Sequence, residues 1–350
     1  MRFELSEEQE LLRRSARELV AAEWPLEKTR AFIEHDARGH DPLAWKHLAE
    51  MGYLSLLLPA DAGGQGLGAI ELAVVCEEMG RACVPGPFLE TVLAGALLAE
   101  AGGHDPLVRR ITSGDAVVTF ARLDSPWASQ SGPRLRFRDG RVRGRKHFVA
   151  YAQEAEALLV LVADGVALAR APFSTTPQET LDPAQRFSAV DLDHPAELVA
   201  NAEILERNDR LAAVGAAAML LGLADRSLEI TLDYVRTRQT FGRPIGSFQA
   251  LQHRLADTWV RVESARAAVY RGAWCVAAGD PAAPLAAATA KAYAGDTARQ
   301  ATGEAIQMHG GIGFTWELDV HLYFKRVKTL EQMYGSTEAH VERALTAFGF

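Results

Sequence analysis

One stretch in the C-terminal half decides the fold. It runs from residue 234 to 257 and reads Tyr234-Val-Arg-Thr-Arg238-Gln-Thr-Phe241-Gly242-Arg-Pro-Ile245-Gly-Ser-Phe248-Gln249-Ala-Leu-Gln252-His-Arg-Leu-Ala-Asp257. Glycine and proline interrupt helices, so this pattern predicts a helix that stops at a turn and then resumes. A guanidinium at Arg238, near the aromatic Phe241 and a turn glycine, could bind a pyrophosphate and a planar ring. An arginine at a helix end is, however, more often only solvated.

A second segment further along the chain is also rich in turn residues. It reads Gln307-Met-His-Gly310-Gly311-Ile-Gly313-Phe314-Thr-Trp-Glu317. Its three glycines would let backbone N–H groups approach a ligand closely. The same glycines could equally be a helix stop, so the residues alone leave both interpretations open.

Around these segments the helical period returns in long, alanine-rich stretches, at 211–236, 247–278 and 284–309. Such stretches predict a helical bundle that is held together by core-facing stripes. Between about residues 116 and 200 the apolar side chains instead recur at every second residue, which is typical of β-strands. Asp139-Gly140 lies between two alternating runs and predicts a type I′ hairpin with Leu135, Phe137 and Val142 on one face. The apolar runs at 157–162 and 165–169 predict two further strands.

The N-terminal third contains residues that typically begin and end helices. Ser6 and Gln9 form a capping box, and Asp41-Pro42 begins a second helix that stops at Gly52. The glycine-rich run 63–68 lacks the spacing of a phosphate loop, so we expect a plain loop entering a helix at 70–80. We therefore expect an α+β, mostly helical protein with three domains: a helical domain at 1–115, a small β domain at 116–203 and a four-helix-type bundle at 204–350.

Composition excludes several classes of function. The chain has 350 residues, and 37 Lys and Arg against 45 Asp and Glu give a net charge of −8, which repels nucleic acid. Three cysteines with no paired spacing point away from disulfides and a structural metal. We found no hydrolase, metalloprotease or Walker A motif. Without a signal peptide or membrane span in the sequence, a cytoplasmic location is expected.

The two quoted segments resemble the acyl-CoA dehydrogenase family, through R-x-x-F-G with F-Q-x-x-Q-x-x-L-A-D and through Q-x-x-G-G-x-G-F. The order of the helical start, the β middle and the helical end extends the resemblance over nearly the whole chain. It implies FAD bound at a subunit interface. It also implies that a carboxylate removes the α-proton of an acyl-CoA, while flavin N5 takes the β-hydride and electron-transferring flavoprotein accepts the electrons.

The resemblance also implies a set of cofactor-binding residues, which in family members reach the flavin of the neighbouring subunit. They are Arg238, Thr240, Phe241, Phe248, Gln249, Gln307, Gly310 and Gly311.

Departures from the family pattern concern the catalytic base and the middle domain. Ungapped counting puts Tyr334 at the usual position of the base and Ala212 at the alternative position. Tyrosine, with a reference pKa near 10, is a poor base at pH 7. In the middle domain the family's flavin segments are replaced around 120–124 and by Phe148-Val149-Ala150, and Ala150 cannot supply a hydroxyl.

Residues that reach a neighbour's flavin are thus present, whereas the base and the chain's own flavin segments are not. This pattern resembles the base-lacking subunit of heteromeric α2β2 acyl-CoA dehydrogenases of bacterial steroid side-chain degradation. Two alternatives remain open: a self-sufficient homomeric enzyme with an unrecognised base, and a non-catalytic flavin- or CoA-binding scaffold. The carboxylates that could be such a base are Glu206, Asp209, Glu331 and Glu338.

Overall fold

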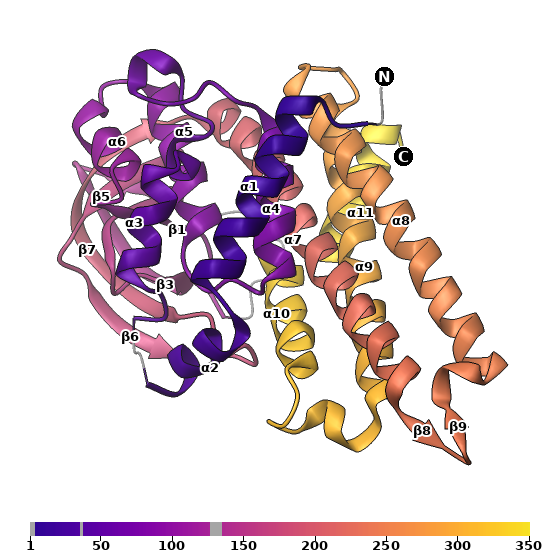
Figure 1. Ribbon diagram of the computed structural model, residues 1–350. Coiled ribbons are helices and arrows are strands. Elements are labelled where there is room, and N and C mark those ends of the chain that lie inside the picture. Colours follow the sequence, from indigo (N-terminus) through magenta and orange to yellow (C-terminus); the bar gives the residue numbers. More distant parts are fainter. Residues whose placement is uncertain (1–3, 36–37, 127–134) are drawn as a thin grey trace. The chain divides into compact units, whose positions relative to one another are not determined.

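The computed structural model describes residues 4–35, 38–126 and 135–350. Helices come first along the chain, a sheet follows, and long helices complete it (Figure 1), which confirms the expected order. The chain forms two compact units. One unit, called here the bundle unit, comprises Met1–Thr29, Ala69–Val84 and Ala213–Phe350, and the other, the sheet unit, comprises Arg30–Gly68 and Pro85–Ala212. The domain boundaries at 115/116 and 203/204 stay a prediction.

The sheet unit is built around a seven-stranded sheet with the order β1-β4-β5-β7-β3-β2, in which β6 pairs with β7. Strand β1 runs parallel to β4, and the other pairs are antiparallel. The strands are β1 (Val117–Ala121), β2 (Phe137–Arg138), β3 (Arg141–Ala150), β4 (Ala155–Val162), β5 (Gly165–Arg170), β6 (Ser174–Gln178) and β7 (Phe187–Ala200). Its principal helices are α3 (Pro42–Glu50), α5 (Phe88–Ala101) and α6 (Asp105–Thr112).

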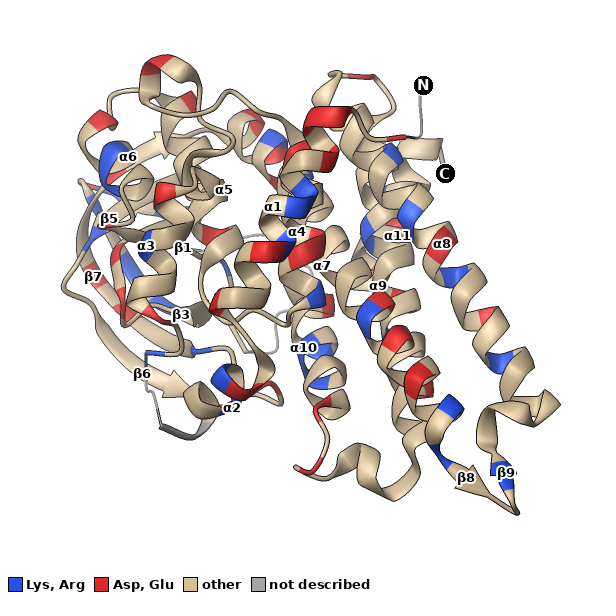
Figure 2. Ribbon diagram, viewed as in Figure 1, with Lys and Arg blue, Asp and Glu red and all other residues tan. Residues whose placement is uncertain are grey.

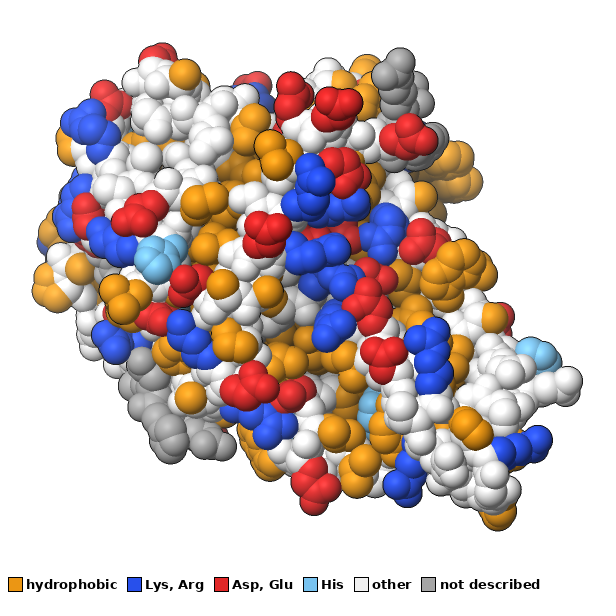
Figure 3. All heavy atoms as spheres, viewed as in Figure 1, with side chains coloured by type: hydrophobic (Ala, Val, Ile, Leu, Met, Phe, Trp, Pro, Cys, Tyr) orange, Lys and Arg blue, Asp and Glu red, His pale blue; other side chains and the backbone are white. Residues whose placement is uncertain are grey.

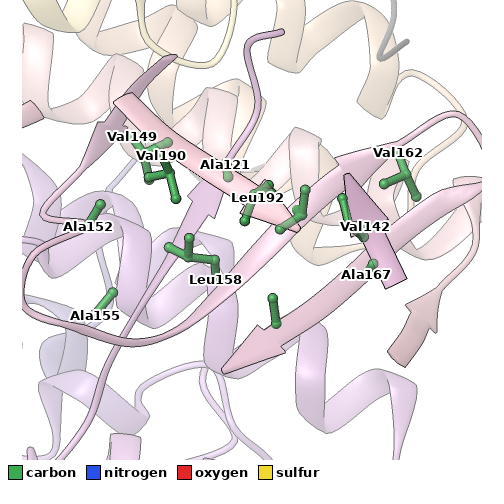
Figure 4. Close-up of a cluster of buried hydrophobic side chains, with 12 residues drawn as sticks. Ala121, Val142, Val149, Ala152, Ala155, Leu158, Val162, Ala167, Val190 and Leu192 are labelled. Carbon is green, nitrogen blue, oxygen red and sulfur yellow. The ribbon is translucent and has the colours of Figure 1, made fainter. Parts of the chain in front are cut away.

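Small and β-branched side chains form the core beside this sheet. Val142, Leu158 and Val190 are fully buried in a cluster supplied by several strands (Figure 4). The turn that joins β2 and β3 has φ of 50° at Asp139 and 67° at Gly140, both positive as a type I′ turn requires. The predicted hairpin is therefore confirmed. Arg134, where the alternating run begins, lies outside the described residues.

The bundle unit contains α1 (Glu7–Glu23), α4 (Ala69–Arg81), most of α7 (Ala202–Thr237), α8 (Gln249–Ala277), α9 (Ala283–His309), α10 (Val320–Gln332) and α11 (Thr337–Phe348). Helix α2 (Leu26–His35) bridges the sequence between α1 and the sheet unit. The capping box at Ser6 and Gln9 is present. Asp41 caps α3 through Leu43, at 2.9 Å, and α4 follows the glycine-rich loop as predicted.

Helix α7 begins at Ala202, nine residues before the predicted start at 211. The first turns of the helix are polar, so apolar periodicity could not reveal them. The Asn201 side chain accepts a hydrogen bond from the Ile204 amide at 3.0 Å and caps the helix. Arg207–Glu203 and Arg210–Glu206 then form i,i+4 ion pairs along it, at 2.6 and 2.7 Å.

Helices α4 and α7 approach each other closely at two glycines. A Cβ on Gly80 would lie 2.1 Å from the Met219 carbonyl oxygen, and one on Gly222 would lie 2.0 Å from that of Glu77. Charged residues of both signs lie along these helices and their neighbours (Figure 2). Glu77 and Glu78, both buried, pair with Arg266 of α8 and Arg17 of α1. The close backbone contact thus lies within a network of ion pairs.

Helix α7 is long and apolar enough to cross a membrane by length and composition, with a mean hydropathy of 1.5 in its best window. However, 78% of that window is buried inside the protein. The hydrophobicity of α7 is accounted for by its place among other helices.

Candidate functional site

The turn after α7 is a tight two-stranded ribbon. Strand β8 (Gln239–Thr240) pairs with β9 (Arg243–Pro244), and the two loop residues, Phe241 and Gly242, have φ of 55° and 76°. Left-handed backbone at a residue other than glycine costs about 1 kcal/mol or more. The Phe241 ring is nevertheless 90% exposed. A strained backbone that presents an aromatic ring to solvent is typical of a binding site.

Aromatic and cationic groups surround this ribbon. The Arg243 guanidinium lies 4.2 Å from the centroid of the Phe248 ring, and the Phe241 ring meets Phe248 edge-on at 6.4 Å. Arg238 is exposed and forms no ion pair within the described ranges. Basic and hydrophobic side chains both reach the surface near this ribbon (Figure 3). Thr240 and Gln249 are exposed as well, Gln249 as the first residue of α8.

The second predicted segment lies where α9 ends. Gln307 is exposed on the last turn, and Gly310 ends the helix with φ 66°. A Cβ on either Gly310 or Gly311 would meet nothing within 4 Å, so a ligand could approach this backbone closely. Gly313 is different, because its Cβ would lie 2.8 Å from the Ile306 carbonyl oxygen. That third glycine is needed for packing rather than for a ligand.

The tertiary structure brings the two segments to the same end of the bundle unit, at the lower end in the view of Figure 1. Tyr234, near the end of α7, stacks on His309, the last residue of α9, with ring centroids 4.2 Å apart. The motifs contained both residues, but the expected site omitted them. Tyr234 precedes Arg238 by four residues, which is one helical turn, and this spacing was the available signal.

The two positions that the sequence predicts for the family's base, 212 and 334, carry no carboxylate. Ala212 is fully buried on α7. Tyr334 follows α10 with φ 60°, and its carbonyl oxygen accepts a hydrogen bond from His340 Nε2 at 3.0 Å. Lys291, which is fully buried, donates to the carbonyl oxygens of Glu331 and Gly335 at 3.0 and 3.1 Å. The Lys291 and His340 side chains therefore hold this turn through hydrogen bonds to its backbone carbonyl oxygens.

The four alternative carboxylates all have partners. Glu206 pairs with Arg210 at 2.7 Å, and Asp209 pairs with Arg122 at 2.8 Å. Glu331 is buried and accepts from the Thr337 hydroxyl at 3.0 Å. For Glu338, in the first turn of α11, hydrogen bonds from its own backbone and from Ser336 lower the pKa. Each of the four carboxylates is therefore already engaged by another group of this chain.

In the sheet unit, the segments that the sequence predicts in place of the family's flavin contacts form hydrogen bonds and an ion pair with neighbouring residues. A register shift interrupts β3 between Lys146 and Val149, where Phe148 has φ 48°. The Phe148 amide donates to Gln178 Oε1 at 2.7 Å. Lys146 is fully buried and pairs with Asp124, and burial lowers its pKa. Ala150 is buried and offers no hydroxyl.

We compared the chemistry of FAD with two parts of the chain: the end of the bundle unit formed by residues 238–249 and 307–311, called here the bundle end, and the sheet segment 148–150. The bundle end presents exposed guanidinium, aromatic and amide side chains beside open backbone at Gly310 and Gly311, which suits an anionic pyrophosphate and a planar ring. The sheet segment at 148–150 presents two apolar side chains and a methyl group. The residues of the bundle end therefore fit part of an FAD molecule, and those of the sheet segment fit less well.

A helical, sheet and helical arrangement with such a bundle end defines the class of protein as an acyl-CoA dehydrogenase fold. The family model "Acyl-CoA dehydrogenase, N-terminal domain" matches residues 6–105, and "Acyl-CoA dehydrogenase, C-terminal domain" matches residues 210–347. The chain belongs to the acyl-CoA dehydrogenase family. The cofactor of this family is FAD.

Particular relatives match along the whole chain. Acyl-CoA dehydrogenase IpdE2 of Mycolicibacterium smegmatis is 35% identical over 341 residues, which cover 97% of this chain and 98% of the relative. Among solved structures, the Tcur3481–Tcur3483 steroid ACAD has a TM-score of 0.90 at 30% identity, covering 98% of each chain. The ChsE4–ChsE5 complex from Mycobacterium tuberculosis has a TM-score of 0.89 at 28% identity, covering 99% of each chain.

Proposed function

We propose that this chain is one subunit of a heteromeric FAD-dependent acyl-CoA dehydrogenase, and that it lends its bundle end to a flavin held mainly by a partner subunit. The observation that carries the proposal is an asymmetry. The bundle end keeps an exposed guanidinium, an exposed aromatic ring and open glycine backbone, while the two base positions hold Tyr334 and Ala212. The partner subunit would then supply the carboxylate base.

Each group of the bundle end has a role in this proposal. Arg238 would bind a pyrophosphate through its guanidinium fork, and Thr240 and Gln249 would donate or accept hydrogen bonds nearby. Phe241 and Phe248 would contact a planar ring. Gln307, Gly310 and Gly311 would approach through an amide side chain and backbone groups. When bound, FAD supplies a hydride acceptor, and no group of this chain has to remove a proton.

The substrate class is an acyl-CoA thioester, and the resemblance to the steroid group favours a steroid side-chain CoA. The name of the Tcur3481–Tcur3483 steroid ACAD, 30% identical to this chain, supports that choice. Electron-transferring flavoprotein would accept the electrons, as in the family. Two heteromers among the similar structures, Tcur3481–Tcur3483 and ChsE4–ChsE5, support a second acyl-CoA dehydrogenase-like subunit as the partner.

The test is the flavin content of the chain with and without its partner. Expressed alone, the chain should purify with little FAD. Co-expressed with an acyl-CoA dehydrogenase-like subunit encoded beside its gene, it should form a yellow complex in which FAD molecules are fewer than chains. The measurement is flavin absorbance after denaturation, together with native mass. A yellow homomer with FAD in every chain and activity on acyl-CoA would overturn the proposal in favour of the self-sufficient enzyme.

A further inference from the structure

Tyr234 and His309 form a contact that the proposed function does not yet use. Their rings stack with centroids 4.2 Å apart and an interplanar angle of 26°. The Tyr234 hydroxyl donates to the His309 carbonyl oxygen at 3.4 Å. One residue comes from the last turn of α7 and the other ends α9. The pair therefore joins two helix ends that are 75 residues apart in the chain.

The imidazole ring is fixed along its edge as well as on its face. His309 Nδ1 lies 2.7 Å from the Ala305 carbonyl oxygen. A carbonyl oxygen can only accept, so Nδ1 carries the proton. His309 is 5% exposed, and burial lowers the pKa of its ring, which favours the neutral form. A neutral ring, held by its own helix and by Tyr234, has little freedom to turn.

Both partners lie directly beside the segments of the candidate site. The Tyr234 carbonyl oxygen accepts from the Arg238 amide at 2.8 Å, and the Arg238 carbonyl oxygen accepts from Ile245 at 2.8 Å, across the ribbon. His309 is the residue before Gly310, whose amide donates to Gln307 and Ile306 at the helix end. Movement at the ring pair would therefore be transmitted to the start of the ribbon and to the glycine turn.

We propose that Tyr234 and His309 are positioning residues that brace the Gly310–Gly311 turn against the end of α7, so that the ribbon and the turn bind one ligand as a preformed site. That the ligand is FAD rests on the proposed function; the brace itself does not. A site whose parts are already fixed loses less entropy on binding than one that must be assembled. The brace should therefore slow the release of FAD without touching it.

The test uses the complex with its partner subunit, and also the isolated chain. Tyr234→Leu removes the stack and the hydroxyl, whereas Tyr234→Phe keeps the stack. In both samples Tyr234→Leu should speed amide hydrogen exchange at residues 310–313 and 239–243. In the complex it should also speed FAD release by about 3- to 10-fold, the range expected for an aromatic pair. Tyr234→Phe should recover most of both effects.

Two controls separate positioning from general loss of stability. Tyr323 is a buried tyrosine of the same unit, whose hydroxyl donates to the Arg81 carbonyl oxygen at 3.1 Å. Tyr323→Leu should lower the melting temperature but leave exchange at 310–313 and FAD release unchanged. In a double-mutant cycle, the effects of Tyr234→Leu and His309→Leu on amide exchange and on FAD release should be strongly non-additive, since either substitution removes the same contact.

The outcomes distinguish this inference from the proposed function. Unchanged exchange at 310–313 in Tyr234→Leu overturns the brace, whatever the flavin does. Faster exchange with unchanged FAD release shows that the brace exists but does not position the ligand site, which also overturns the inference. If Arg238→Ala leaves FAD binding intact, it is the proposed function that fails, and exchange in the isolated chain still decides whether the brace is real.

Discussion

Arg238 is the residue on which the proposed use of the bundle end most depends. Replacing it with Ala should weaken FAD retention by the complex about 10- to 100-fold, the range for a charge-assisted hydrogen bond. Arg238→Lys should retain only part of the wild-type affinity for FAD, because a point charge cannot replace the bidentate guanidinium fork. The measurement is FAD content after gel filtration, with far-UV circular dichroism to confirm unchanged helix content.

Arg236 gives a matched control for that prediction. It stands two residues earlier on α7, is also exposed, and pairs with Asp233 at 3.2 Å. Arg236→Ala removes the same side chain outside the ribbon and should leave FAD content unchanged. Equal FAD loss in the two alanine variants would mean that only the positive charge of the helix end matters.

His340 predicts a pH dependence of stability. Burial, followed by the nearby charge of Lys291, lowers the pKa of His340 to about 3, against an ordinary value of 6.5. Between these two pH values the unfolded chain binds a proton that the folded protein does not, so the free energy of unfolding falls as pH drops through this window. The loss in the free energy of unfolding is about 1.4 kcal/mol for each unit by which the two pKa values differ.

The variant that tests this is His340→Gln, because an amide can still donate to the Tyr334 carbonyl oxygen but does not titrate. Its melting temperature should fall less steeply than that of the wild type between pH 6.5 and 4. His253→Gln, at an exposed position on α8, should follow the wild type. Parallel curves for His340→Gln and the wild type would contradict the assignment.

At the scale of elements, the packing of α4 against α7 depends on glycine. A Cβ at position 222 would lie 2.0 Å from the Glu77 carbonyl oxygen, and backbone cannot give way as a flexible side chain can. Gly222→Ala should therefore destabilise the protein by about 1–3 kcal/mol or more. Chemical denaturation followed by circular dichroism measures the effect.

Gly303 on α9 is the counterpart, because a Cβ there meets nothing within 4 Å. Alanine costs less entropy than glycine in a helix, so Gly303→Ala should stabilise the protein by about 0.5–1 kcal/mol. Stabilisation in both variants would show that helix propensity, and not the close approach of α4 and α7, determines the result.

At the scale of the whole molecule, the proposal that the partner subunit supplies the base predicts which substitutions abolish the reaction. A positioned general base contributes typically about 10²–10⁴-fold. The rate of flavin reduction by acyl-CoA should stay within a few fold of the wild-type rate in each single variant of this chain. These variants are Tyr334→Phe and Gln substitutions at Glu206, Asp209, Glu331 and Glu338. Replacing the partner's carboxylate should abolish it while FAD stays bound.

Single-turnover bleaching of the flavin is the appropriate measurement, because it isolates the chemical step from electron transfer to the acceptor. FAD content and native mass of each variant complex serve as controls for assembly. A drop of two orders of magnitude from one substitution in this chain, with FAD retained, would make the chain catalytic and favour the homomeric enzyme.

The order of helical and β regions, the Asp139-Gly140 turn and the caps at Ser6 and Asp41 could all be predicted from the sequence, because they depend on neighbours a few residues away. Its motifs also indicated the family, and its residue identities at 212 and 334 fixed the absence of a carboxylate there. It could not give the start of α7, since the polar turns after Ala202 are stabilised by Asn201 and ion pairs rather than by an apolar stripe.

Only the tertiary structure decided which of these residues act together. The ring stack of Tyr234 on His309 joins positions 75 residues apart. The same holds for Glu331, whose burial and partners come from α9 and α11. Such contacts depend on the packing of distant helices, and short-range sequence patterns carry no information about that packing.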